Sequence, residues 1–282
     1  MTTKSQPGWG RNAGMALIAV LWIVAALSLL VVGMSQTVRQ QIRLVGTQND
    51  EVRGQALGEA AVMLALQELQ VAPERPRGLV RVNQQFAGVD MTVEVMPING
   101  LISLNGANAL LLAGAFKVAA GMNTSAAEAL ANELVAWRGE AGEGGEKRWF
   151  EAVEDLLLVP GIDYALYERV SPLFTTITKT PGVNPLAAPQ EVLTVLAEGN
   201  AERASSIAQR RADGDVGIDT SALNPNFVTS GVSDEYRLSV RVPLEGGKIL
   251  LLTRDVGLTR TPSGEPWRVF SAMRRILSLS SS

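Results

Sequence analysis

Residues 15–34 read MALIAVLWIVAALSLLVVGM, a run without a charged side chain. An α-helix rises about 1.5 Å per residue, so roughly 20 apolar residues cross the ~30 Å hydrocarbon core of a bilayer. No other stretch of the sequence is comparably long and apolar. We therefore predict one transmembrane helix over residues 15–34, with the bulk of the chain following it.

The segment before this run, MTTKSQPGWGRNAG, is polar and carries Lys4 and Arg11 but no acid. A secretory signal peptide has a shorter apolar core, of roughly 7–15 residues, and its cleavage site lies behind that core. Here the small residue Gly14 comes directly before the apolar run instead. This order resembles type IV prepilins and the pseudopilins of type II secretion. The resemblance implies a leader over residues 1–14, cleavage after Gly14 by a prepilin peptidase, and N-methylation of Met15.

An uncleaved single-pass anchor is the alternative interpretation of the same residues. The flanking charges do not fix the orientation of either form in the membrane. Lys4 and Arg11 precede the apolar run, and Arg39 and Arg43 follow it. The count that underlies the positive-inside rule is therefore close to a tie.

The composition argues for a structural or binding protein. The chain has 282 residues, of which 46% are hydrophobic and 19% charged, so it can bury a core. The net charge of −3 argues against bulk nucleic-acid binding, which favours a basic surface. The sequence has no cysteine and no histidine. Disulfides, thiolate metal sites, cysteine nucleophiles and histidine-based triads are therefore excluded, and we expect no enzyme.

The apolar run continues into a second helical pattern over residues 35–71, without a proline until Pro73. Its apolar residues recur mostly at three- and four-residue steps, which predicts one amphipathic face. The members of this face are Val38, Ile42, Val45, Val52, Leu57, Ala61, Leu64 and Leu69. We expect either one helix from Met15 to about Val71 or two helices joined near Gly46. Gly54 and Gly58 mark points of softness or close packing.

Strand patterns lie on both sides of a helical block. Residues 91–95 alternate between the two faces of a strand, with turn signals at Ala87-Gly88 and Asn99-Gly100. Residues 235–260 read as a hairpin that turns at Gly246-Gly247. For residues 266–276, PWRVFSAMRRI, a strand competes closely with a helix.

Between these strands the pattern is helical. We expect a first helix from about Ala107, a second capped by Thr124 or Ser125, a helix pair around the Pro160-Gly161 turn, and two more over residues 188–214. The predicted fold class is α+β, with a pilin-like long N-terminal helix packed on an antiparallel sheet. A large all-α insertion, similar to SAM or helix-hairpin-helix domains, interrupts that sheet. The predicted segments behind the leader are 15–34, 35–106, 107–216 and 217–282.

This order resembles the minor pseudopilin K subunit of the type II secretion system, the general secretion pathway protein K family. The strings that carry the resemblance are GMALIAVLW, INGLISLN, EDLLLVPGID with LYERVSPLFT, and VNPLAAPQEVLTVLAEG. The resemblance implies a single-pass protein of the bacterial inner membrane with its head in the periplasm. It also implies a place at the tip of the pseudopilus, where the chain initiates or caps the fibre. The implied partners are I- and J-like minor pseudopilins, the major pseudopilin and the prepilin peptidase.

Two positions differ from common patterns. Most pilin-like subunits carry Glu at mature position five, where the family pairs it with the N-terminal amine of the subunit ahead; here that residue is Ala19, as in K-like subunits. Some K subunits bind calcium through acids around a tryptophan. In this chain Trp137 is followed by Arg138 and Gly139, and Glu140, Glu143 and Glu146 are spaced in a glycine-rich loop. We therefore expect a solvated acidic loop and no cofactor, with calcium as the alternative.

Nucleic-acid binding and catalysis are the two other classes of function to compare with the sequence. The string DLLLVPGID resembles the hairpin of helix-hairpin-helix modules, so a membrane-anchored nucleic-acid binder is the alternative function. Acids on both sides of the turn argue against phosphate contacts there. Catalysis has no candidate constellation, because the acidic pairs Glu154/Asp155 and Asp213/Asp215 read as solvated surface and no serine has a base beside it. We expect no nucleic acid as a partner.

Overall fold

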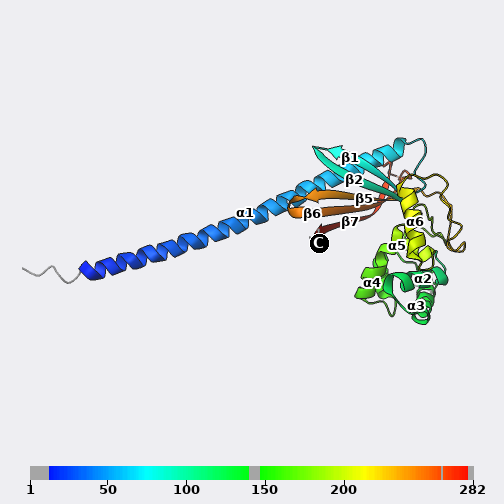
Figure 1. Ribbon diagram of the computed structural model, residues 1–282, viewed down its shortest axis with the longest axis horizontal. Helices are drawn as coiled ribbons and strands as arrows, with labels where there is room; N and C mark the ends of the chain where they lie inside the picture. Colours follow the sequence, from blue (N-terminus) through cyan, green and yellow to red (C-terminus); the bar gives the residue numbers. More distant parts are fainter. Residues whose placement is uncertain (1–12, 140–146, 262, 279–282) are drawn as a thin grey trace, which may run out of the picture. The chain divides into compact units, whose positions relative to one another are not determined.

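The computed structural model describes residues 13–139, 147–261 and 263–278, without side-chain detail at 13–16 and 29–48. The chain divides into two compact units, Met1–Arg53 and Gly54–Ser282. The N-terminal helix α1, Ala13–Val71, is continuous (Figure 1), so a break near Gly46 is not found. Within the described residues, no helix has the length and apolar character needed to cross a membrane. Residues 15–16 and 29–34 of the predicted span lie outside the residues whose side chains are described.

The second unit contains one antiparallel sheet. Its strands are β1 (Val80–Phe86), β2 (Val89–Pro97), β5 (Glu235–Leu244), β6 (Lys248–Gly257) and β7 (Arg268–Ser278), in the order β1-β2-β5-β6-β7. Two of the predicted turns are confirmed: Ala87 and Gly88 have positive φ angles of 50° and 77°, and Gly246 and Gly247 both have 71°. Asn99-Gly100 lies in a 3₁₀-helix, Ile98–Gly100. Residues 268–276 form a strand and not a helix. An α+β fold class is therefore confirmed.

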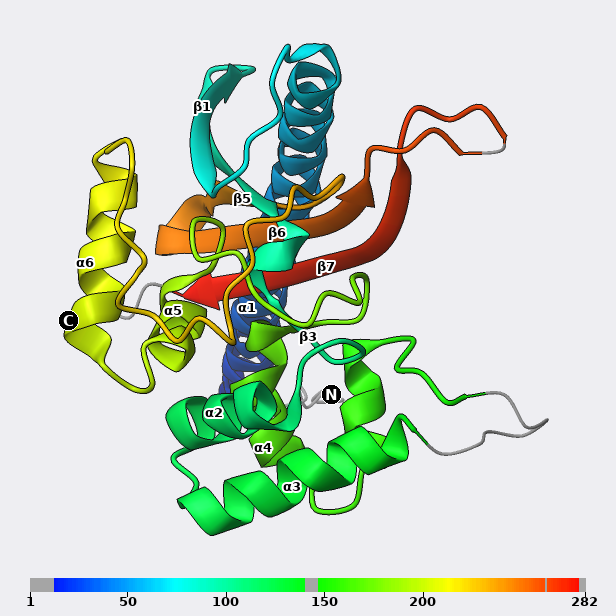
Figure 2. The same cartoon turned by 90° about the vertical axis from the view of Figure 1, so that its right-hand side faces the viewer.

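Residues 54–71 of α1 cover one face of this sheet (Figure 2). Leu57, Ala61 and Leu69 of the predicted face are buried, whereas Val52 is 67% exposed and belongs to the first unit. The stripe that packs on the sheet also holds Val62, Ala65 and Leu66, which the prediction missed, and the two glycines Gly54 and Gly58. The two glycines are sites of close packing. A Cβ placed on Gly58 lies 2.0 Å from Leu252 Cδ1, and one on Gly54 lies 2.4 Å from Leu244 Cδ2.

Five helices form the rest of the unit: α2 (Ala109–Ala120), α3 (Thr124–Trp137), α4 (Tyr164–Val170), α5 (Gln190–Leu196) and α6 (Ala201–Ala212). Helices α2, α3 and α4 lie close to one another, next to the sheet and not on it (Figure 1). A second apolar core extends from Met96 to Phe227 and joins these helices. The boundaries predicted for the insertion, 107–216, stay a prediction.

The structure corrects three details of the helical block. Helix α3 is capped by Asn123, whose Oδ1 accepts from the Ala126 N–H at 2.9 Å, and not by Thr124 or Ser125, because the helix already begins at Thr124. Residues Val153–Leu158 form a 3₁₀-helix and not an α-helix, because the run is short and ends at Pro160. The block is not purely helical, since β3 (Ile102–Ser103) and β4 (Phe174–Thr175) pair in parallel.

A glycine fixes the junction between β3 and α2. A Cβ on Gly106 would lie 2.3 Å from the carbonyl oxygen of Lys179, a backbone atom that has little room to shift. We expect Gly106→Ala to lower the free energy of unfolding by about 2 kcal/mol, measured by chemical denaturation of the full chain in detergent. Gly231→Ala is the matched control, because its new Cβ would meet Thr229 Oγ1 at an ordinary 3.6 Å. Equal stability of the two variants would contradict the prediction.

Candidate functional site

The predicted processing site lies at the start of α1. Gly14 and Met15 fall in the first turn of this helix, and their side chains are outside the described residues. Cleavage after Gly14 and methylation of Met15 therefore stay predictions. Ala19, the predicted fifth mature residue, is exposed.

The stretch considered for calcium begins at the end of α3. Residues 140–146, which carry Glu140, Glu143 and Glu146, lie outside the described residues. Arg138, where an acid was expected for calcium, donates to the carbonyl oxygens of Leu104 and Ala107, both at 2.6 Å. Burial lowers the pKa of Arg138 from its ordinary value. Arg138 therefore holds the end of α3 against the segment that precedes α2.

Two lysines lie close to Trp149, which follows this stretch in the sequence. Lys147 and Lys179 lie over the Trp149 ring, with their Nζ atoms 5.2 and 4.0 Å from the ring centroid. Trp137 stacks on Phe150 at 4.4 Å between centroids. In the part of the chain that the structure describes, no cluster of three or more acids has the arrangement of a metal site.

The Pro160-Gly161 turn joins the 3₁₀-helix to α4. Gly161 has a φ of 88°, and the Ile162 N–H donates to the Val159 carbonyl oxygen at 3.2 Å. Asp163 caps α4, because its Oδ1 accepts from the Leu166 N–H at 2.8 Å. The turn thus packs two helical segments together, and its nearest carboxylate is in place to repel phosphate. No contact in the hairpin favours the nucleic-acid alternative.

A groove of about 780 Å³ separates the uncovered face of the sheet from the residues around Trp149. Its floor includes Thr253 and Asp255 of β6 and Met273 of β7. The opposite wall is built by residues 149–154 and 171–179. The lining mixes aromatic, apolar and charged side chains.

A bidentate ion pair between Arg237 and Asp255 lies among the residues that line the groove. Arg237 Nε and Nη2 donate to the two carboxylate oxygens of Asp255 at 2.7 and 2.8 Å. The two side chains are only 16% and 5% exposed. Because both charges are paired and nearly buried, the pair fixes the register of β5 and β6 and offers no free acid or base.

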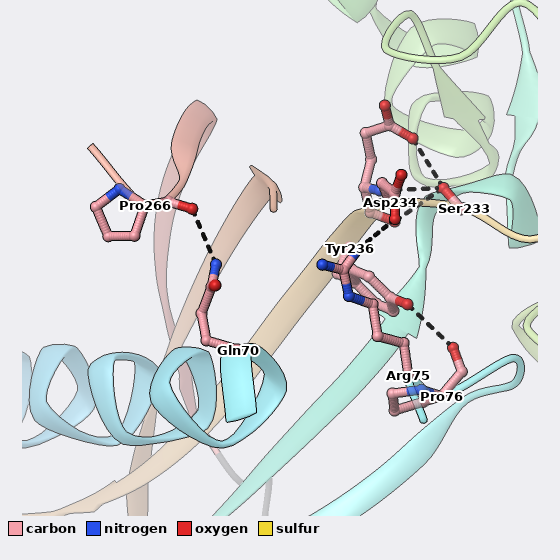
Figure 3. Close-up of polar contacts among 8 residues, drawn as sticks. Gln70, Arg75, Pro76, Ser233, Asp234, Tyr236 and Pro266 are labelled. Carbon is pink, nitrogen blue, oxygen red and sulfur yellow. Dashed lines mark hydrogen bonds and ion pairs between the residues drawn. The ribbon is translucent and has the colours of Figure 1, made fainter. Parts of the chain in front are cut away.

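Figure 3 shows how the end of α1 is fastened to the C-terminal strands. Gln70 Nε2 donates to the Pro266 carbonyl oxygen at 2.9 Å, and Arg75 forms an ion pair with Asp234. The hydroxyl of the buried Tyr236 donates to the Pro76 carbonyl oxygen at 3.3 Å. These contacts tie helix, loop and sheet into one unit.

Ionisation of Tyr236 is expected to lower the stability of this junction at alkaline pH. Burial raises the pKa of its phenol above the ordinary value of 10.0, and Asp234 and Glu235 add to the shift, while Arg75 opposes it. Ionisation is thus harder in the folded chain, so its contribution to stability is intact below about pH 10 and is lost above that pH. We expect Tyr236→Phe to cost about 1 kcal/mol at pH 8, because one hydrogen bond is lost.

The measurement is the free energy of unfolding of both proteins between pH 8 and pH 11. The fall at alkaline pH should be smaller in Tyr236→Phe than in the parent. Tyr167, whose pKa is also raised, first by burial and then by Glu154, leaves a residual slope in both. Identical slopes in the two proteins would contradict the assignment to Tyr236.

The sequence named a strand as one interpretation of residues 266–276, but it did not predict that β7 lies at the edge of the sheet. All of its residues except Ser271 are exposed, and it carries Arg268, Arg274 and Arg275. The signal was present in the sequence, since residues 266–282 contain three arginines and no acid although the whole chain is net acidic. Its meaning depends on the strand order, which places β7 at the border of the sheet.

The elements define an α+β protein with a pilin-like head, in which a long helix packs on an antiparallel sheet beside a helical block. Comparison with known protein families finds no match for this sequence, and comparison with curated proteins finds none either. Solved structures do match. A chain of the GspK-GspI-GspJ complex from the type 2 secretion system of enterotoxigenic Escherichia coli superposes with a TM-score of 0.51 and 14% sequence identity. The match covers 81% of this chain and 98% of that chain.

The match confirms, at the level of the fold, the resemblance to type II secretion pseudopilins that the sequence motifs predicted. The solved neighbour is a structural assembly of three different subunits.

Proposed function

We propose that this chain is a K-type minor pseudopilin of a type II protein secretion system. The observation that carries the proposal is the fold match over 98% of a chain from the GspK-GspI-GspJ complex. The sequence motifs support it independently, since they cover the N-terminal start, the β3 region and the Pro160-Gly161 turn. The chain acts by packing against other subunits, and it uses neither catalysis nor a cofactor.

Residues 15–34 anchor the chain in the inner membrane, and the head faces the periplasm. The uncharged run supports the anchor, and the polar leader that ends in Gly14 supports processing by a prepilin peptidase. In lipid, helices associate through close van der Waals fit of small residues. Ala16, Ala19, Ala25, Ala26, Ser28 and Gly33 supply such residues on this helix.

Ala19 supports a place at the tip of the fibre. A carboxylate at this position would cost roughly 2.5–3.5 kcal/mol in the bilayer unless it were paired. A subunit that has no neighbour ahead of it has no partner for that carboxylate, so an apolar residue suits the first position. The head then docks on I- and J-like pseudopilins, and together they initiate or cap a fibre of the major pseudopilin.

Mass spectrometry of the mature N-terminus tests the processing step. The chain co-expressed with a prepilin peptidase should begin at a methylated Met15. Gly14→Val should leave the chain intact from Met1, because a bulky residue replaces the glycine before the cut. Gly10→Val, a change of the same size inside the leader, should be processed normally. An intact Met1 start in the parent protein would overturn the processing step.

Co-purification tests the assembly. The full chain, extracted in mild detergent, should retain the I- and J-like pseudopilins of its own secretion system at micromolar concentration. Loss of this complex in every detergent and salt condition would contradict the proposed partners.

Thermal unfolding with and without EDTA tests for a structural metal. An unfolding midpoint that EDTA leaves unchanged supports the absence of a structural metal, and a lower midpoint would favour the calcium alternative.

A further inference from the structure

Strand β7 is an open edge of the sheet. Within the described residues it pairs only with β6, through a register that runs from Lys248↔Ser278 to Gly257↔Arg268. Its other side therefore presents the backbone N–H and C=O groups of alternate residues of an eleven-residue strand. An edge of this length is a template for another strand unless the protein blocks it.

The side chains of β7 differ from those of the opposite edge, and its three arginines would repel a basic strand but not an acidic one. The central residues of β1 are polar and bonded to their neighbours, with Asn83 on Thr92 at 3.2 Å and Gln85 on Asp90 at 2.9 Å. On β7, five large apolar side chains are between 39% and 48% exposed. They are Val269, Phe270, Met273, Ile276 and Leu277. This edge therefore exposes more large apolar side chains than β1, where Val80 and Phe86 are exposed.

Its charge is uniformly positive. Arg268, Arg274 and Arg275 lie on β7, and no acid occurs from residue 266 to 282, in a chain whose net charge is −3. The carboxylates beside the strand have other partners, since Asp255 pairs with Arg237 and Glu59 with Arg254. Among the described residues, no carboxylate forms an ion pair with an arginine of β7. Arg274 Nη1 donates to Gln55 Oε1 at 2.8 Å, and the Arg268 guanidinium lies over the Phe270 ring. Neither partner is charged, so the edge keeps uncompensated positive charge.

The two central arginines point to opposite faces of the sheet. Arg274 is paired with Leu252, a residue buried against α1, whereas Arg275 is paired with Leu251, which lines the groove. Apolar residues flank the arginines on both sides along the strand: Ala272 and Met273 before them, and Ile276 and Leu277 after them. On each face, a cation is therefore followed by an exposed apolar neighbour.

We propose that β7 is a docking edge for an added β-strand, supplied by a partner protein as an extended segment with two adjacent acids flanked by apolar residues. Backbone hydrogen bonds would hold this segment, and its two carboxylates would meet Arg274 and Arg275 on opposite faces. A second copy of this chain fits poorly, because pairing two β7 strands would bring six arginines to one seam. The proposal does not depend on the function proposed above.

Binding of a designed peptide to the full chain in detergent micelles tests the proposal. The probe is the labelled, end-blocked peptide Thr-Val-Ile-Glu-Glu-Val-Ile-Thr, and fluorescence anisotropy is the readout. We expect saturable binding that weakens with salt, because the contact is partly electrostatic. A peptide with N-methyl groups on every amide keeps the side chains and removes the donors of both edges. It should bind at least about tenfold more weakly, because backbone pairing is lost.

A charge-reversal variant tests whether the peptide binds at β7 or at another part of the surface. The variant Arg274→Glu/Arg275→Glu should lose the Glu-Glu peptide and gain a Lys-Lys peptide of otherwise identical sequence. Lys117→Glu, a reversal at an exposed residue of α2, should leave both affinities unchanged. Circular dichroism checks that every variant is folded, and β7 tolerates the reversal because both side chains are exposed.

Four outcomes would overturn the proposal. They are no saturable binding of the Glu-Glu peptide up to about 1 mM, equal binding of the N-methylated peptide, unchanged affinity in the charge-reversal variant, or a dimer of the chain that this variant abolishes. The last outcome would assign the edge to a second copy. None of these results bears on whether the chain is processed at Gly14 or binds I- and J-like subunits.

Discussion

Asp255→Ala is expected to lower the free energy of unfolding by about 3–5 kcal/mol, measured by chemical denaturation of the full chain. Asp255 is 5% exposed at its side chain and accepts two hydrogen bonds from Arg237, at 2.7 and 2.8 Å. Removing the carboxylate leaves a guanidinium that is only 16% exposed without its counter-charge. The cost arises from that uncompensated charge and not from the attraction of the pair itself.

Two controls make this explanation testable. The double variant Arg237→Met/Asp255→Leu removes both charges and should recover most of the lost stability, because apolar residues of similar size replace a desolvated pair. Asp234→Ala breaks the ion pair with Arg75, whose two side chains are 35% and 57% exposed, and should cost at most about 1 kcal/mol. A double variant as unstable as Asp255→Ala would show that the pair is needed for more than charge compensation.

Local signals predicted the elements whose structure depends on neighbours in sequence. The alternation at residues 91–95 and the Gly246-Gly247 turn lie within strands and turns that fold with short-range hydrogen bonds, so the sequence pattern was sufficient there. The long helix was predictable for the same reason, since no proline interrupts residues 13–71. Residues 268–276 were ambiguous because a short apolar and basic run satisfies both periodicities.

Features that depend on distant partners were not predictable. Strands β3 and β4 are two residues long and pair in parallel across a large separation in sequence, so neither has a local pattern. Asn105 is similar, because its side-chain amide donates to the Phe150 carbonyl oxygen and accepts from the Phe150 N–H, both at 2.9 Å. The buried face of α1 was only partly predicted. Softness and close packing both stayed open at Gly54 and Gly58 until Leu244 and Leu252 were seen beside them.

The candidate sites also differ in whether a local sequence pattern is sufficient to predict them. The leader, Gly14 and Met15 form a contiguous motif, so sequence alone predicts the processing step. The groove and the β7 edge are products of strand order, because β7 becomes a border only when β6 occupies its other side. Three arginines without an acid in residues 266–282 were visible in the sequence, but the charge pattern alone does not say which surface carries them.

Phe174→Ala is expected to lower the free energy of unfolding by about 3–5 kcal/mol, because a fully buried ring is replaced by a cavity. Phe174 lies on β4 inside the core that joins α2–α6, and its ring centroid is 6.2 Å from that of Phe116. Phe174→Leu keeps most of the volume and should cost less than half as much. Equal losses for the two variants would contradict a cavity as the cause.

Hydrogen exchange shows where this loss is located. The buried residues form two separate apolar cores, one around Phe174 and one between α1 and the sheet. We therefore expect Phe174→Ala to accelerate amide exchange in α2 and α3 more than in β5 and β6. Leu66→Ala, at a fully buried position of α1 in the other core, should show the opposite order. Equal acceleration everywhere in both variants would mean that the two cores unfold as one cooperative unit, and the helical block would then depend on the sheet for its stability.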